Sequence, residues 1–119
     1  MNYTKINIGG KERGAKLGLG FLDRITKAEN ISLQEVFTKF EKETLSFLPK
    51  MVYYSVLYND ERAGNKADYN LDDVFDWIDE VGLTSETIKS FIDAFTKSVE
   101  VHFKEKEGKS TPQKKVAQK

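Results

Sequence analysis

The stretch Met51–Tyr58, MVYYSVLY, decides the fold, because it is apolar on almost every face of a helix. This pattern is typical of a helix that other elements cover on several sides. We therefore expect the core to be built around it. Pro49 is poorly tolerated inside a helix, so we expect a break at residues 44–46 and a central helix whose first turn contains Phe47, Leu48 and Pro49.

Two helices are expected before the central one. The sequence Ser32–Glu35, SLQE, is a capping box, in which each of the two terminal side chains satisfies a backbone N–H group of the other residue. Apolar residues then recur at helical spacing, at Leu33, Val36, Phe37 and Phe40. A shorter helix is expected earlier, ending near residues 28–30 and containing Phe21, Leu22 and Ile25.

Two further helices are expected after the central one. Residues 59–70, NDERAGNKADYN, are polar, contain Gly64 and predict a loop. Asn70 then caps a helix that Gly82 ends and whose apolar positions are Leu71, Val74, Phe75, Ile78 and Val81. A long last helix begins at residues 84–86, with inward side chains at Ile88, Phe91, Ile92, Phe95, Val99 and Phe103.

The N-terminal stretch Asn7–Phe21, NIGGKERGAKLGLGF, carries five glycines and raises the question of phosphate binding. A phosphate-binding loop needs Lys and then Ser or Thr after its second Gly, but Ala15 and Lys16 follow Gly14. The dinucleotide-binding pattern fails because Asp23 stands where a third small residue is needed. Neither type of nucleotide site is predicted.

The same glycines suit a turn. Tyr3–Ile8 alternates polar and apolar residues, and Gly9-Gly10 can adopt the positive φ angles of a two-residue hairpin turn. We expect a returning strand over residues 11–19. Its apolar side contains Ala15, Leu17 and Leu19, and the spacing excludes Arg13 from that side only weakly.

These elements predict a mainly α protein, a small helical domain of about five helices with an N-terminal β-hairpin, over residues 1–104. A chain of 119 residues can bury a sizeable core without disulfides or metals. Residues 105–119, EKEGKSTPQKKVAQK, contain one apolar residue larger than Ala and are expected to form a flexible, disordered charged tail.

Composition limits the classes of function. The chain has no cysteine, no N-terminal signal peptide pattern and no apolar run of about 20 residues, so we expect a soluble, unexported protein. Its 19 basic and 19 acidic residues cancel, which does not favour a nucleic-acid partner. The charges are uneven, with six acids and no basic residue in residues 68–80. Such polarity suits docking to a partner, although solvated faces also produce it.

The acidic segment is the sharpest candidate for a metal site. A partial match to the calcium loop of EF-hand proteins is formed by Asp68, Asn70, Asp72 and Asp79. However, Asp73 stands where that loop needs Gly, and the helical pattern runs through the segment. The one histidine, His102, has no matching nucleophile, so a structural role is favoured. We expect no catalytic residue, no metal and no cofactor.

Aromatic residues are the candidate partner contacts. Trp77 lies between the apolar and acidic sides of its helix, which is typical of a residue with one edge in water. A core position is favoured for it, and a partner contact is the alternative, since Trp is enriched at binding hot spots. The candidate partner-binding residues are Tyr54, Tyr58, Phe75 and Trp77.

Five segments carry a family resemblance through their order and spacing, namely Ile6–Lys11 (INIGGK), Leu17–Leu22 (LGLGFL), Ile31–Glu35 (ISLQE), Tyr53–Tyr58 (YYSVLY) and Leu71–Ile78 (LDDVFDWI). In this the chain resembles the tail assembly chaperones of siphophages and prophages of Gram-positive bacteria. The resemblance implies a non-enzymatic protein of the host bacterial cytoplasm that coats the tape measure protein, helps to recruit tail tube subunits and is absent from the virion. It also implies possible self-association. A further implication is a longer product made by a ribosomal frameshift, and the candidate site at which the ribosome shifts reading frame is Lys114-Lys115.

The main alternative belongs to another class. A small phage or host regulatory protein could bind nucleic acid through the basic N-terminal hairpin. The hairpin lacks the interleaved aromatic residues of such proteins beyond Tyr3 and Phe21, and the chain is neutral. A small hydrolase is less favoured still, because no nucleophile with a matching base is visible.

Overall fold

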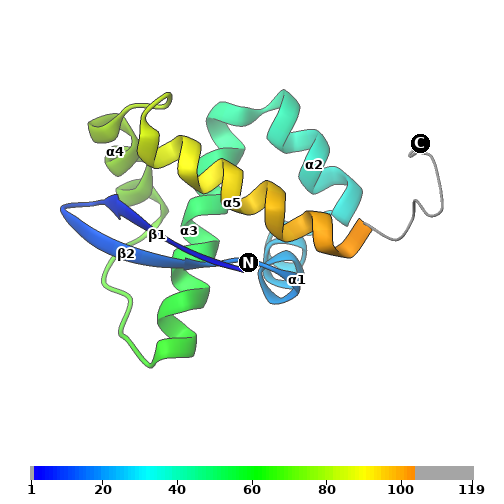
Figure 1. The fold of residues 1–119 in the computed structure, drawn as a ribbon, viewed down its shortest axis with the longest axis horizontal. Helices are drawn as coiled ribbons and strands as arrows, with labels where there is room; N and C mark the ends of the chain where they lie inside the picture. Colours follow the sequence, from blue (N-terminus) through cyan, green and yellow to red (C-terminus); the bar gives the residue numbers. More distant parts are fainter. Residues whose placement is uncertain (1, 104–119) are drawn as a thin grey trace.

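The computed structural model describes residues 2–103, which form a two-stranded antiparallel hairpin and five helices (Figure 1). In chain order the elements are β1 (Tyr3–Ile8), β2 (Lys11–Lys16), α1 (Leu19–Glu29), α2 (Leu33–Lys42), α3 (Thr44–Ala63), α4 (Leu71–Val81) and α5 (Glu86–Phe103). The predicted fold class is therefore confirmed. The tail predicted over residues 105–119 lies outside the described residues, as does Lys104 at the predicted domain boundary.

Helix α3 forms the centre of the domain, as its sequence predicts. It packs against β2, α1, α2 and α4, and in Figure 1 it runs behind the hairpin and α5. Its buried residues are Phe47, Leu48, Pro49, Met51, Val52, Ser55, Val56 and Tyr58. A helix covered by four elements needs apolar residues on most sides, which is why its pattern lacks a polar face.

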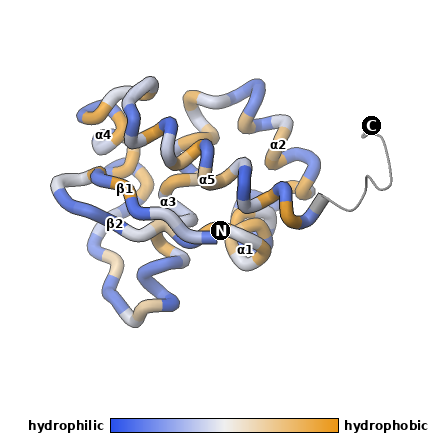
Figure 2. The backbone as a smooth tube through the Cα atoms, viewed as in Figure 1, coloured by the Kyte–Doolittle hydropathy of each residue, from blue (hydrophilic) through white to orange (hydrophobic). Residues whose placement is uncertain are grey.

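Helix α5 covers the domain on the side of β1 and the first helices. Hydrophobic and hydrophilic residues alternate along it (Figure 2), and its buried apolar residues are Ile88, Phe91 and Phe95. The Phe95 ring lies 6.1 Å from the ring of Phe21 in α1 and 5.8 Å from that of Phe40 in α2, between centroids. One aromatic side chain thus joins three helices. In the described part of the chain, no helix combines the length and apolarity needed to cross a membrane.

The hairpin turns at Gly9 and Gly10, as predicted. Their φ angles are +67° and +83°, which only glycine adopts readily at both positions of such a turn. The pairing runs from Ile8 opposite Lys11 to Tyr3 opposite Lys16. The predicted length of the second strand is wrong, because β2 ends at Lys16 rather than at residue 19. Gly18 has a φ of +90° and the chain enters α1 at Leu19.

Two helices begin with reciprocal caps. Ser32 and Glu35 form the predicted capping box at α2, with hydrogen bonds of 3.1 and 2.8 Å. Asn70 caps α4 as predicted, and Asp73 completes a second box by accepting from the Asn70 backbone N–H group. Gly82 follows the last residue of α4.

Both predicted ends of the central helix are wrong. It begins at Thr44, so Pro49 lies in its second turn rather than its first. Pro49 removes one hydrogen bond, the one to the carbonyl of Leu45 near the solvated helix start, and the turn before it already forms as Phe47 donates to Glu43 O at 2.8 Å. The helix also continues through residues 59–63, for which the polar sequence predicts a loop, and it ends at Ala63, followed by Gly64 with φ +78°.

Candidate functional site

Arg13 and Trp77 hold the hairpin against α4. The Arg13 guanidinium donates to the carbonyls of Ile8 at 2.9 Å and Gly9 at 3.1 Å, at the hairpin turn. Its central carbon lies 4.1 Å from the centre of the Trp77 ring. This distance is within the range of a cation–π contact. We call this pair the Arg13–Trp77 clamp.

Gly9 allows the Trp77 ring to lie close to the hairpin turn. A Cβ atom at Gly9 would lie 2.5 Å from Cε2 of Trp77, so a side chain at this position would displace the indole ring. Two requirements therefore favour glycine at position 9. The first is the positive φ angle of the turn, and the second is the close contact with Trp77.

A chain of aromatic rings continues from the clamp to α3. Between centroids, the Trp77 ring lies 5.3 Å from that of Tyr69, which lies 6.2 Å from Tyr53, which lies 5.3 Å from Tyr54. The hydroxyl of Tyr69 donates to Asp60 at the end of α3. Burial first, and then this hydrogen bond, raise the pKa of Tyr69 far above its ordinary value.

The structure brings two of the four candidate partner contacts into this aromatic chain. Trp77 and Tyr54 are both half-buried within it, whereas Tyr58 and Phe75 make no ring contact with it among the described residues. Tyr58 is only 8% exposed and packs under Arg24, whose central carbon lies 4.6 Å from the ring centre. Phe75 is 36% exposed, so it is the most accessible of the four.

Tyr54 belongs to a polar network that ties α3 to α1. Its hydroxyl donates to Glu29 at 2.8 Å, and Lys50 donates to the other oxygen of that carboxylate at the same distance. Burial opposes ionisation of Glu29, but the hydrogen bonds from Lys50 and Tyr54 outweigh it and lower the pKa of the carboxyl. Burial, followed by the bond to the charged Glu29, raises the pKa of Tyr54 to about 12.

The acidic residues of α4 point away from the core. The carboxylates of Asp72, Asp76, Asp79 and Glu80 are exposed and have no ion pair within residues 2–103. As predicted, the helix runs straight through the segment that partly matches a calcium loop. Within the described residues, no three His, Cys, Asp or Glu side chains are grouped closely enough to hold a metal ion. His102 is half-buried in the last turn of α5.

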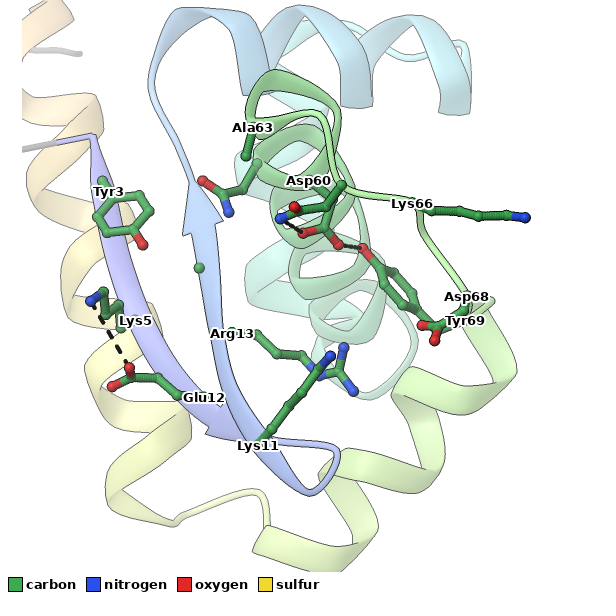
Figure 3. Close-up of a pocket in the computed structure, with 13 residues that line it drawn as sticks. Tyr3, Lys5, Lys11, Glu12, Arg13, Asp60, Ala63, Lys66, Asp68 and Tyr69 are labelled. Carbon is green, nitrogen blue, oxygen red and sulfur yellow. Dashed lines mark hydrogen bonds and ion pairs between the residues drawn. The ribbon is translucent and has the colours of Figure 1, made fainter.

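A cleft of about 560 Å³ lies between the hairpin and the end of α3 (Figure 3). On one side are Tyr3, Lys5 and the first residues of β2, and on the other are the last turns of α3 and the loop that follows it. Figure 3 shows β2 between β1 and the loop that carries Lys66, Asp68 and Tyr69. The cleft therefore runs along the side of β2 that is not paired with β1 and also reaches Tyr3 and Lys5 of β1.

Models of known protein families, curated proteins and solved structures were all compared with the chain, and none matched. Two surfaces remain as candidates on physical grounds. One is the exposed side of α4 around Phe75, and the other is the cleft beside β2.

Sequence reasoning missed Arg13 and the cleft. The alternation along the hairpin excluded Arg13 from the buried side only weakly, and in the structure Arg13 does share that side with Ala15. The alternation along the hairpin was therefore a usable signal for the position of Arg13. It could not indicate that Trp77, 64 positions later, is the aromatic partner of this basic residue. The cleft depends on loop 65–69, whose position follows from Tyr69 and Asp60 rather than from a motif.

Proposed function

We propose that this protein is a phage tail assembly chaperone of the host bacterial cytoplasm, which binds the tape measure protein, keeps it soluble and helps to recruit tail tube subunits. The observation that supports this most directly is the exposed side of α4. There Phe75 is 36% exposed beside carboxylates that have no ion pair within residues 2–103. An apolar contact framed by free charges suits a partner that must later be released.

The spacing on α4 defines what such a partner needs. Asp72 precedes Phe75 by three residues and Asp79 follows it by four, so both flank the ring on the helix surface. Leu83, just beyond the end of α4, is also exposed. An amphipathic helix with an apolar face flanked by Lys or Arg would complement this surface. A tape measure protein is a long helical chain whose apolar faces would aggregate if left uncovered.

The segments that carry the family resemblance support the proposal in a second way. Each contributes to a different part of the same domain, namely β1 with its turn, the start of α1, the start of α2, the middle of α3 and most of α4. A resemblance spread over elements that pack together reflects a shared arrangement better than one confined to a single segment would.

Co-expression with overlapping tape measure fragments tests the proposal. The protein is expected to keep at least one otherwise insoluble fragment in solution. Phe75→Ser should abolish this rescue. Leu45→Ser is the matched control, because Leu45 is 74% exposed at the start of α3 and its removal should leave the rescue intact. Failure of the unmodified protein with every fragment would overturn the proposal, and equal effects of the two variants would reject α4 as the contact.

Nucleic-acid binding by the hairpin is the competing function. Of the hairpin cations, Arg13 is engaged in the clamp and Lys5 lies 3.9 Å from Glu12. Lys11 and Lys16 are then the hairpin cations that have neither an ion pair nor a place in the clamp within residues 2–103, a small positive surface for binding phosphates. Titration with duplex and single-stranded DNA at low and moderate salt separates the two functions, because binding to phosphates weakens steeply as salt rises.

A further inference from the structure

Strand β2 has an edge without a partner. In a hairpin with a two-residue turn, the residues beside the turn exchange hydrogen bonds, and such pairs then alternate with pairs that do not. Ile8 pairs with Lys11 next to the turn, so the backbone groups of Glu12, Gly14 and Lys16 point away from β1. In residues 2–103 these outward groups have no hydrogen bond to any other element.

The cleft lies along this edge. Glu12 and Gly14 line it directly, and Asn59 faces them from α3. Gly14 lets Asn59 approach β2 closely, since a Cβ atom at Gly14 would lie 2.6 Å from Nδ2 of Asn59. The Asn59 side chain would therefore have to turn away to admit a strand beside Gly14. The Asn59 amide itself has no hydrogen-bond partner within the described residues. An incoming strand would lie about 4.8 Å from β2 and would meet both sets of polar groups.

The charges of the cleft favour an acidic occupant. Lys11 and Lys66 line it without an ion pair in the described part of the chain, and Arg13 bonds only neutral carbonyls. Of the three carboxylates in the lining, Glu12 is paired with Lys5, while Asp60 accepts only from the neutral Tyr69 and Asn65 and keeps its charge. Asp68 is the third. Outside the pair of Lys5 and Glu12, three cations therefore face two carboxylates, which leaves the cleft one excess positive charge.

We propose that the free edge of β2 binds an extended acidic segment of a partner protein by strand addition. Backbone hydrogen bonds from Glu12 and Gly14 hold the segment, and Lys11 and Lys66 pair with its carboxylates. A second copy of β2 is a poorer occupant, because it would bring the same Lys and Arg side chains opposite these cations. The inference goes beyond the proposed function, since it concerns a different surface and a partner in a different conformation.

A titration of the full chain, labelled with ¹⁵N, tests the proposal. The probe is a synthetic eight-residue peptide in which Glu alternates with Val or Thr. Saturable shifts are expected at the backbone amides of residues 12–16 and 65–69. The same peptide methylated at alternate backbone nitrogens cannot pair with a strand and should bind much more weakly. No saturable binding at millimolar peptide, shifts centred elsewhere, or equal binding of the methylated peptide would each overturn the proposal.

Proline variants identify the edge that is used. Glu12→Pro removes one outward N–H group of β2 while leaving the hydrogen bonds to β1 intact, and should weaken binding about fivefold. The variant also removes a carboxylate, which by charge alone would strengthen binding of an acidic peptide. Asn7→Pro is the matched control, because Asn7 pairs with Glu12 and points outward from β1. If Asn7→Pro weakens binding as much as Glu12→Pro does, strand addition to β2 is rejected.

Discussion

Replacing Trp77 by Ala is expected to lower the free energy of unfolding by about 3 kcal/mol. A fully buried aromatic residue costs roughly 3–5 kcal/mol when it is cut back to Ala, and Trp77 belongs at the low end because part of its ring is in water. The contact with Arg13 supplies about 1 kcal/mol of this. Trp77 is the only Trp of the chain, so the variants are followed by circular dichroism in urea. A loss of about 3 kcal/mol lowers the urea midpoint by roughly 1.5 M, at a slope of about 2 kcal/mol per molar.

A double-mutant cycle isolates the clamp from the rest of the burial. Arg13→Lys keeps the positive charge but loses the planar guanidinium that lies over the ring. Its effect should be about 1 kcal/mol smaller in the Trp77→Ala background than in the unmodified protein. Arg24→Lys is the control, since Arg24 contacts Tyr58 and Glu61 instead, and its effect should add to that of Trp77→Ala.

The stability of the Trp77→Ala variant and its coupling to Arg13 also decide whether Trp77 is available for binding a partner. If Trp77→Ala costs less than about 1 kcal/mol and shows no coupling to Arg13, the clamp does not hold the domain together. The ring would then be available as a binding hot spot, whose removal costs roughly 2 kcal/mol of binding free energy. A large loss of stability with strong coupling assigns most of the ring to the fold.

Two further variants test individual contacts. The pKa of Tyr54 is raised to about 12, so the stability that comes from this raised pKa is complete below pH 10, the ordinary value, and is lost as the pH rises from about 10 to 12. Tyr54→Phe should make the fall in stability over that range less steep, and an unchanged slope of stability against pH in urea titrations would mean that the pKa of Tyr54 is not raised. Gly20→Ala places a Cβ atom against the hydroxyl of Tyr58 and should cost about 1–3 kcal/mol. Adding Tyr58→Phe removes that hydroxyl and should recover part of the loss, whereas no recovery would mean that the clash lies elsewhere.

The elements that the sequence predicts well are those whose signals are local. The capping box of Ser32 and Glu35 and the glycine pair at the hairpin turn each specify backbone geometry within a few residues. The position of α3 at the centre also follows from its own residues, because a helix without a polar face must be covered. No knowledge of distant partners is needed for any of these.

The elements that the sequence predicts poorly depend on distant residues. Residues 59–63 are polar enough to form a loop, but the helix continues because Glu61 pairs with Arg24 of α1 and Arg62 donates to the Tyr58 hydroxyl at 3.2 Å. The role of Arg13 depends in the same way on Trp77, which the packing of α4 against α3 and β1 places over the guanidinium. Such contacts leave little trace in the periodicity of either segment.

The two candidate surfaces, the exposed side of α4 and the cleft beside β2, are joined by the Arg13–Trp77 clamp. Phe75 and Trp77 stand on the same helix, while Arg13 and Gly14 stand on the same strand, and the Arg13–Trp77 clamp joins helix to strand. A ligand that pairs with β2 contacts the residues on either side of Arg13, and a helix that binds α4 contacts residues next to Trp77. The clamp is therefore the contact through which the two surfaces are joined. Ligands on the acidic side of α4 and at the edge of β2 would influence each other only if both changed this contact, because two sites are coupled only through an element that both ligands bias.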